Sequence, residues 1–279
     1  MLVPSQPSPN QTRLGNLTVT TLSDGFLDVP GAYFSNLSPQ EHTRVLPTAR
    51  FGANIWLIEA GARKVLVDAG SGSWLKERFA DTGNLGWQLD DRAPERAAVT
   101  DIIVTHMHAD HIGGLVAGGR SLFPNATIHV QASEWAFWTD VALPQSVPED
   151  QRPLIELIQA LGNPLKGQIK LHEGKADLGG GINLLPAAGH TPGHQVVHLS
   201  AGTRELMLIA DAVVSEALQF GNPDIHYALD GDPAKAAETR KTLFDRIASD
   251  RIPFAATHLT STGFGHLERS GSGYDYTAA

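Results

Sequence analysis

The sequence predicts a layered α/β fold, because short apolar segments with strand character alternate with helical patterns along its 279 residues. The composition, 42% hydrophobic and 18% charged, is that of an ordinary globular protein and excludes disordered, collagen-like and coiled-coil classes. No shift in composition marks a domain boundary. We therefore expect a single domain over residues 1–279, in which residues 1–17 form an extended or flexible N-terminal strap.

Eight runs rich in Val and Ile, bounded by Gly, Asp or His, predict buried strands. They cover residues 54–58, 64–67, 101–104, 127–130, 182–185, 195–199, 205–209 and 253–256.

The clearest helix runs from Pro233 to about Ser249, because Asp232 suits the N-cap and Pro233 the first helical position. Weaker helical patterns cover residues 73–80, 133–141 and 149–161. Strands and helices thus alternate over most of the chain.

The charge balance, 21 basic against 30 acidic residues, gives a net charge of −9. Neither nucleic acid nor an anionic membrane is an expected partner of such a surface. The chain has no cysteine, which excludes disulfides, thiolate metal ligands and a cysteine nucleophile.

The first 16 residues lack the basic start and apolar core of a secretory signal peptide. No segment approaches the roughly 18 apolar residues of a membrane-spanning helix. We expect a cytoplasmic protein, with a periplasmic origin after removal of a leader as the alternative.

The segment 105–114 carries the strongest chemical signal, because His106, His108, Asp110 and His111 follow directly after a predicted strand. Two imidazoles at positions i and i+2 can converge on one divalent ion, while Asp110 and His111 serve a second. Neutral imidazole and carboxylate favour zinc and also accept manganese, cobalt or iron.

Three later strands each end near another potential ligand: His190, Asp211 and His258. Ligands from four strand ends can gather at one edge of the layers. Five histidines and two aspartates suffice for two metal ions if one carboxylate bridges them, and Asp211 is the natural bridge.

These residues resemble the H-x-H-x-D-H signature of the metallo-β-lactamase-fold superfamily, and residues 65–70, Val-Leu-Val-Asp-Ala-Gly, resemble its strand-turn motif. The resemblance implies a four-layer αβ/βα sandwich with the site at its edge. It also implies the ligand sets: His106, His108 and His190 for the first metal, Asp110, His111 and His258 for the second, and Asp211 between them.

Within the superfamily, residues 123–126, 134–138 and 263–267 resemble the methyl parathion hydrolase group and its lactonase and arylesterase relatives. Quorum-quenching lactonases share the stretch 189–194. The absence of cysteine excludes the β-lactamases with a cysteine ligand, and His108 stands where flavodiiron-type members carry Glu.

The predicted site implies hydrolysis, because two cations that share a water provide hydroxide at neutral pH and polarise a carbonyl or phosphoryl oxygen. Asp211 takes part as the bridging carboxylate. Asp110 is either a plain ligand or also the carrier of a proton to the leaving group. Asp68 is expected to orient a ligand imidazole, with a turn-capping role as the alternative.

Aromatic residues suit an apolar substrate pocket, with core packing as the alternative. By resemblance, the expected pocket residues are Trp138, Phe220 and Phe264, joined by His266. A homodimer, the commonest assembly of such proteins, is also an expectation.

The leading hypothesis is a binuclear hydrolase of a neutral, small ester-like molecule: a lactone, an aryl ester or an organophosphate triester. A β-lactam or glutathione thioester hydrolase is the nearest alternative. A mononuclear iron oxygenase that uses only the first ligand set, and a metal-stabilised binding protein without turnover, complete the alternatives.

Overall fold

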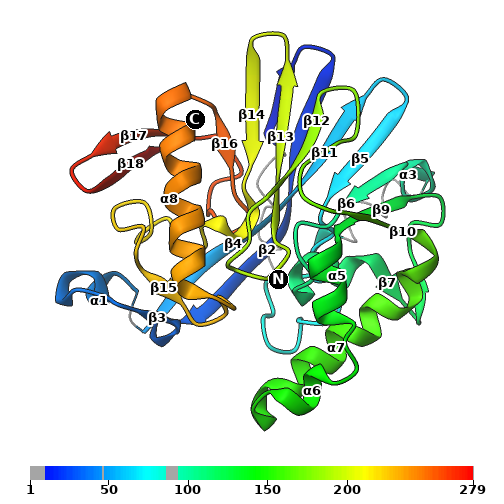
Figure 1. Ribbon diagram of the computed structural model, residues 1–279, viewed down its shortest axis with the longest axis horizontal. Helices are drawn as coiled ribbons and strands as arrows, with labels where there is room; N and C mark the ends of the chain where they lie inside the picture. The colour runs from blue at the N-terminus through cyan, green and yellow to red at the C-terminus, as the bar shows by residue number, and fades with distance from the viewer. Residues whose placement is uncertain (1–9, 46, 86–93, 279) are drawn as a thin grey trace, which may run out of the picture.

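Two β-sheets form the centre of the molecule in the computed structural model, which describes residues 10–45, 47–85 and 94–278 (Figure 1). The first sheet has the order β1 (Asn10–Leu14), β2 (Leu17–Pro30), β4 (Thr48–Ala60), β5 (Arg63–Val67), β6 (Asp101–Ile103), β9 (Thr127–Gln131), β10 (Ile169–His172). The second has the order β11 (Ala176–Asp177), β12 (Ile182–Pro186), β13 (Gln195–Ala201), β14 (Arg204–Leu208), β16 (Phe254–Ala255).

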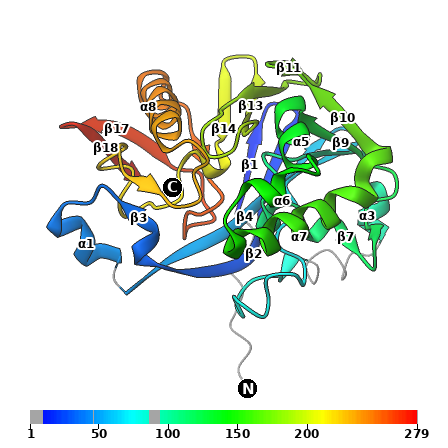
Figure 2. The same cartoon turned by 60° about the horizontal axis from the view of Figure 1, so that its bottom comes forward.

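Smaller ladders and helices surround the two sheets. The ladders pair β3 (Phe34–Ser35) with β15 (His226–Tyr227), β7 (Val116–Ala117) with β8 (Arg120–Ser121), and β17 (His266–Ser270) with β18 (Gly273–Thr277). The helices are α1 (Pro39–Val45), α3 (Pro94–Ala98), α4 (Ala109–Ile112), α5 (Ala132–Trp138), α6 (Leu143–Ser146), α7 (Arg152–Gly162) and α8 (Pro233–Asp250). Helix α8 lies on one side of the sheets and α5, α6 and α7 on the other (Figures 1 and 2).

Successive side chains of the central strands point to opposite faces of the sheet and pack in different hydrophobic clusters. Val65 and Val67 of β5 pack between the sheets, whereas Leu66 packs in the outer cluster that includes Ile158 of α7. In the second sheet, Met207 of β14 packs in the cluster of α8. Burial on both faces explains the continuous apolar runs of these strands. The order helix, sheet, sheet, helix confirms the predicted four-layer αβ/βα fold.

Several predicted elements are confirmed, with shifted ends. The Asp232 side chain accepts a hydrogen bond of 3.0 Å from the amide of Lys235 and thereby caps α8. Residues 10–14 of the predicted strap form β1, which pairs with β2, and residues 1–9 lie outside the described residues. Among the described helices, none has the length and hydropathy that crossing a bilayer requires.

The predicted helix over residues 73–80 is wrong, because this segment forms a series of turns. The buried carboxylate of Asp24 accepts hydrogen bonds from the amides of Ser71, Gly83 and Leu85. Both ends of the segment are therefore held close together, which a straight helix of that length would prevent.

Candidate metal centre

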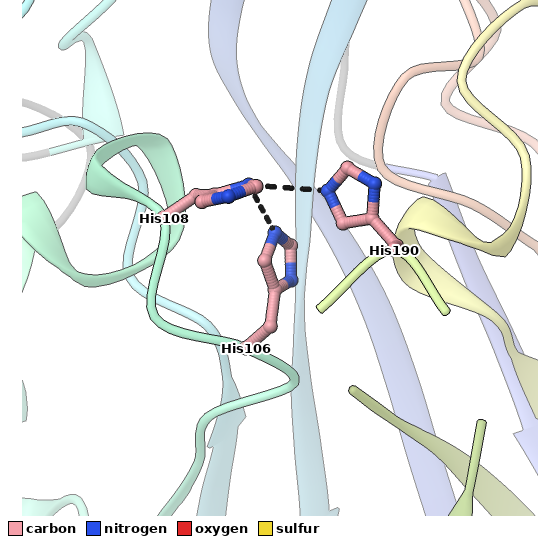
Figure 3. Close-up of side chains that lie close together, drawn as sticks. All are labelled: His106, His108 and His190. Atoms are coloured by element: carbon pink, nitrogen blue, oxygen red, sulfur yellow. Dashed lines mark hydrogen bonds between the residues drawn. The ribbon is translucent and has the colours of Figure 1, made fainter. Parts of the chain in front are cut away.

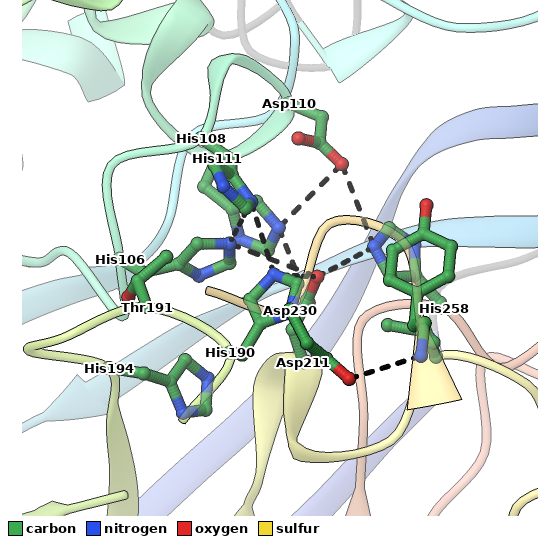
Figure 4. Close-up of polar contacts among 12 residues, drawn as sticks. His106, His108, Asp110, His111, His190, Thr191, His194, Asp211, Asp230 and His258 are labelled. Carbon is green, nitrogen blue, oxygen red and sulfur yellow. Dashed lines mark hydrogen bonds and ion pairs between the residues drawn. The ribbon is translucent and has the colours of Figure 1, made fainter. Parts of the chain in front are cut away.

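The seven predicted ligands meet at one edge of the sandwich, in loops and short helices that follow strand ends (Figure 4). Strand β6 leads to the loop of His106 and His108 and then to α4. The other ligands follow β12, β14 and β16. Since these strand ends lie at the same edge, residues far apart in the sequence can share one site.

The first triad, His106, His108 and His190, points its ring nitrogens toward one point (Figure 3). Nδ1 of His108 lies 3.0 Å from Nε2 of His106 and 3.1 Å from Nε2 of His190. His108 thus presents its δ nitrogen, whereas the other two present their ε nitrogens. All three side chains are buried.

The second triad consists of Asp110, His111 and His258. Oδ2 of Asp110 lies 3.7 Å from Nε2 of His111 and 3.6 Å from Nε2 of His258. These distances are longer than the 3.0 Å and 3.1 Å between the nitrogens of the first triad.

Asp211 lies between the triads. Its Oδ2 is 3.3 Å from Nε2 of His190 and 3.0 Å from Nε2 of His258, and its Oδ1 is 3.3 Å from Nε2 of His111. One carboxylate therefore faces ligands of both triads, in the bridging place that the sequence predicts for it.

The residues fit a pair of divalent metal ions. Nε2 of His111 and Oδ1 of Asp211 are buried and lie 3.3 Å apart, but neither has a hydrogen bond to any described residue. Leaving such atoms unsatisfied costs about 1 to 3 kcal/mol each. Two orphaned lone pairs that face the same centre, within a set of imidazoles and carboxylates, are what a bound zinc-like ion would satisfy.

Four of the five predicted imidazole ligands have a further partner at the ring nitrogen on their far side. Oδ2 of Asp68 lies 2.8 Å from Nδ1 of His111, and Oδ1 of Asp230 lies 2.9 Å from Nδ1 of His190. Such contacts fix the tautomer and orientation of a ligand imidazole. The remaining two are Oγ1 of Thr105 at 3.1 Å from His106 Nδ1, and the carbonyl of Gly52 at 2.9 Å from His258 Nδ1.

Asp68 occupies the supporting position expected from the sequence. It has a φ of 60°, a conformation that is uncommon for residues other than glycine. Its carboxylate also accepts hydrogen bonds from the amide and the hydroxyl of Thr105, at 2.8 Å and 2.7 Å. One side chain thus organises both His111 and the start of the ligand loop.

Asp230, which sequence analysis missed, supports His190 in the same way. Its Oδ2 accepts a hydrogen bond of 3.2 Å from the amide of Tyr227 and lies 3.8 Å from Nη2 of the buried Arg240. The residue stands in a loop before α8, 40 positions from its partner. No motif or spacing in the sequence indicated the contact.

Glu134 is a second missed residue. Its buried carboxylate accepts hydrogen bonds from the amides of Met107 and Gly193, from the hydroxyl of Thr191 and from the indole of Trp138. A Cβ on Gly193 would lie 2.3 Å from the Glu134 nitrogen, so only glycine permits this approach. Glu134 therefore ties the His106 loop to the His190 loop.

The pKa values of the imidazoles reflect burial and the neighbouring carboxylates. Burial keeps the pKa of His106 and His108 well below the usual range, so both rings are neutral ligands. At His190 burial lowers the pKa, but hydrogen bonds and charges from Asp211 and Asp230 outweigh it and raise the pKa to about 9. The surrounding carboxylates thus favour positive charge at this edge.

Two cavities open onto the site. A pocket of about 640 Å³ lies beside His108 and His190, and Trp138 lines it, as the sequence predicts. A smaller pocket of about 120 Å³ lies beside Asp110 and His258. Substrate can therefore approach the centre from the side of either triad.

The other three predicted pocket residues lie elsewhere, so that prediction is wrong for them. Phe220 packs in the core under α8, where its ring stacks 4.7 Å from that of Tyr276. Phe264 packs in the core between the sheets. His266 is exposed on β17. The physical reason is that Gly265 pairs with Phe254, which directs this segment along β16 and away from the metal edge.

Known proteins are similar to this chain in sequence and in fold. The model of the metallo-beta-lactamase superfamily matches residues 48–273. A probable metallo-hydrolase of Mycobacterium tuberculosis is 25% identical over 218 residues, which cover 70% of this chain and 67% of the relative. Human metallo-beta-lactamase domain-containing protein 1 is 30% identical over 205 residues, which cover 74% of this chain and 63% of the relative.

Two solved structures superpose on nearly the whole chain. The dizinc quorum-quenching lactonase AidC, in complex with a product, has a TM-score of 0.88 and 27% identity and covers 97% of both chains. The hydrolase AbOPH has a TM-score of 0.86 and 28% identity, covering 97% of this chain and 96% of its own. The chain therefore belongs to the metallo-beta-lactamase superfamily and is a metal-dependent hydrolase.

Proposed function

We propose that the protein hydrolyses a neutral lactone with two divalent metal ions, zinc being the favoured metal. The observation that carries this proposal is Asp211, whose two oxygens face ligands of both triads and leave one oxygen orphaned. Two ions held by these residues would lower the pKa of a shared water and polarise the carbonyl of the substrate.

The large pocket supports a neutral, apolar substrate. Its walls include Phe137, Trp138 and Ile155. Lys235 also lines it, and its Nζ lies 2.9 Å from the carboxylate of Glu238. A pocket of this kind favours an apolar substituent over an anionic one. The similarity to the lactonase AidC adds lactones as the preferred ester class.

Asp110 is the proposed proton carrier to the leaving alkoxide. Its side chain is 18% exposed, and it lines the small pocket. It is therefore the one residue of the second triad that both faces the centre and reaches solvent. A ligand role alone would not require that exposure.

Arg78 favours one alternative, a β-lactam or thioester hydrolase, because this residue lines the small pocket and its guanidinium could bind a substrate carboxylate. Its Nη2 already donates a hydrogen bond of 2.9 Å to the hydroxyl of Tyr33. The complete second triad speaks against a mononuclear iron oxygenase.

The test is the ratio of kcat/KM for an aromatic lactone to that for an aryl phosphotriester, on protein of measured metal content. We expect a ratio far above one and loss of both activities after chelation. A ratio far below one would assign the enzyme to the phosphotriesterases. Turnover of a β-lactam or glutathione thioester, with lactones untouched, would contradict the proposal.

A further inference from the structure

A separate cavity of about 320 Å³ lies at the end of the sandwich that faces away from the metal centre. Arg204, at which β14 begins, and Pro253, which directly precedes β16, both line it. The predicted ligands Asp211 and His258 follow the other ends of these two strands. The cavity and the metal centre are therefore distinct sites at opposite ends of the second sheet.

Three arginines from three different elements line this cavity: Arg13 of β1, Arg204 of β14 and Arg251, which follows α8. All three residues are exposed. None of their guanidinium groups forms a hydrogen bond or an ion pair with any residue that the structure describes. Because the chain as a whole has a net charge of −9, the cavity is a local concentration of positive charge on an acidic protein.

The two carboxylates on the lining belong to Glu205 and Asp250, and both lie beside Arg246 of α8 instead. Oε2 of Glu205 is 3.4 Å from Nη2 of Arg246 and 2.6 Å from Nε2 of His198. Oδ2 of Asp250 is 3.9 Å from Nε of Arg246. Neither acid forms an ion pair with the three arginines of the cavity, so their charge is left for a bound molecule.

Arg251 also has an unusual backbone conformation. Its φ of 54° and ψ of 40° are left-handed, and at the end of a helix this conformation favours glycine. A cation at this end does interact favourably with the dipole of α8. That interaction accounts for Arg251 alone, because Arg13 and Arg204 come from strands. A bound anion accounts for all three.

The inner lining of the cavity is apolar and buried, and it consists of Leu14, Leu206, Ile252 and Phe264. A volume of about 320 Å³ suits a small molecule rather than a protein segment. Guanidinium groups bind phosphate through paired N–H donors, and the three terminal oxygens of a phosphate monoester can engage several of them at once. We propose that this cavity binds the phosphate monoester of a small organic molecule, with the phosphate among the arginines and the organic group against the apolar lining.

The test uses phenylphosphonate, in which a P–C bond replaces the hydrolysable ester bond, and measures its affinity for the metal-loaded protein by calorimetry. We expect R204Q and R251Q each to bind it at least about tenfold more weakly than wild type, because each loses a charge-assisted hydrogen bond. R120Q is the matched control, since Arg120 is an exposed arginine on β8, outside the cavity. Equal affinity in all four proteins would overturn the proposal.

Binding at the metals is separated by a second measurement, because a phosphonate is also a ligand for metal ions. In the cobalt-loaded protein, visible absorption reports binding at the metals only. We expect R204Q and R251Q to keep the wild-type absorption titration while calorimetry loses the binding event at the cavity. A single binding event that changes the cobalt spectrum and is the same in every variant would contradict a second site.

Two further probes test the ligand class. Inorganic phosphate lacks the organic group, and benzoate has one charge and two oxygens, so we expect both to bind more weakly than phenylphosphonate. Tighter binding of benzoate would assign the cavity to carboxylates, and tighter binding of inorganic phosphate would show that the apolar lining does not contact the ligand. Either result would overturn the assignment to a phosphate monoester.

Discussion

The two triads differ in composition and in exposure. The first consists of imidazoles alone, and its side chains of His106 and His190 are 0% and 2% exposed. The second includes Asp110, whose side chain is 18% exposed and borders the small pocket. One half of the centre is therefore a more deeply buried set of imidazoles, whereas the other includes a partly exposed carboxylate.

The carboxylates that hold the outer ring nitrogens of the triad imidazoles also differ in their contacts. Asp230, which holds His190, lies close to the buried Arg240 of α8. Arg240 Nε also donates a hydrogen bond of 2.8 Å to the carbonyl of Ala212, next to Asp211. Asp68, which holds His111, is instead bonded to the ligand loop itself. Each triad thus has a buried carboxylate behind it, and Asp211 faces ligand atoms of both.

The largest effect is expected from Asp211→Asn, because this change removes the charge that both triads share. Substitution of residues that only support metal ligands typically lowers metal affinity or activity by about 10 to 100-fold. Asp211 faces the predicted metal positions directly, so we expect kcat/KM to fall by more than about 100-fold. Metal analysis of the purified variant should show less than the wild-type content. Wild-type metal content together with wild-type activity would show that the triads do not depend on a common bridge.

The next largest effect distinguishes metal binding at the first triad from metal binding at the second. Asp230→Asn should weaken metal binding at the first triad and Asp68→Asn at the second, each by about 10 to 100-fold. Competition with a chelator, followed ion by ion, measures both steps. We expect the two variants to affect different steps. If both weakened the same step, the supporting carboxylates would not be assigned to separate halves.

A smaller effect concerns the pocket beside the first triad. Trp138→Leu should raise KM by about tenfold for lactones with a bulky apolar substituent, because wall contacts of this size contribute about 1 to 3 kcal/mol. Phe220→Ala is the matched aromatic control. It should lower the free energy of unfolding by about 3 to 5 kcal/mol and leave KM unchanged. A raised KM in the control would restore Phe220 to the pocket.

The clustering of the predicted ligands could be expected from the sequence, whereas many of the contacts that hold these side chains in place could not. The density of His106, His108, Asp110 and His111 after a buried strand is a local signal. Glu134, by contrast, meets Gly193 59 positions away and carries no periodic pattern. Such a contact depends on how the loops close over one another, which residue spacing does not encode.

The strands show the same limit. Strand β5 was predictable because burial on both faces leaves an apolar run. Strand β2 was missed because its sequence is rich in Thr, Ser and Asp, and only its pairing with β4 makes it a strand. Trp138 lines the large pocket, whereas Phe264 packs between the sheets, and the sequence could not separate the two because aromatic residues serve cores and pockets equally well.

The last prediction concerns stability rather than activity, and it involves His194, which lies behind the first triad. Its ring lies 5.3 Å from that of His106, and burial, together with the charge of His190, lowers its pKa to about 4. In the unfolded chain the His194 imidazole is protonated below about pH 6.5, whereas in the folded chain it stays neutral down to about pH 4. The free energy of unfolding therefore falls as the pH is lowered through this range. His194→Asn does not titrate there, and its amide can still donate to the carbonyl of Ala187 as Nδ1 does. Urea unfolding of the metal-free proteins at pH 7.5 and pH 4 should therefore show about 3 kcal/mol less acid destabilisation in the variant. Equal losses in both proteins would mean that His194 is protonated in the fold and that the first triad is no more sensitive to acid than the second.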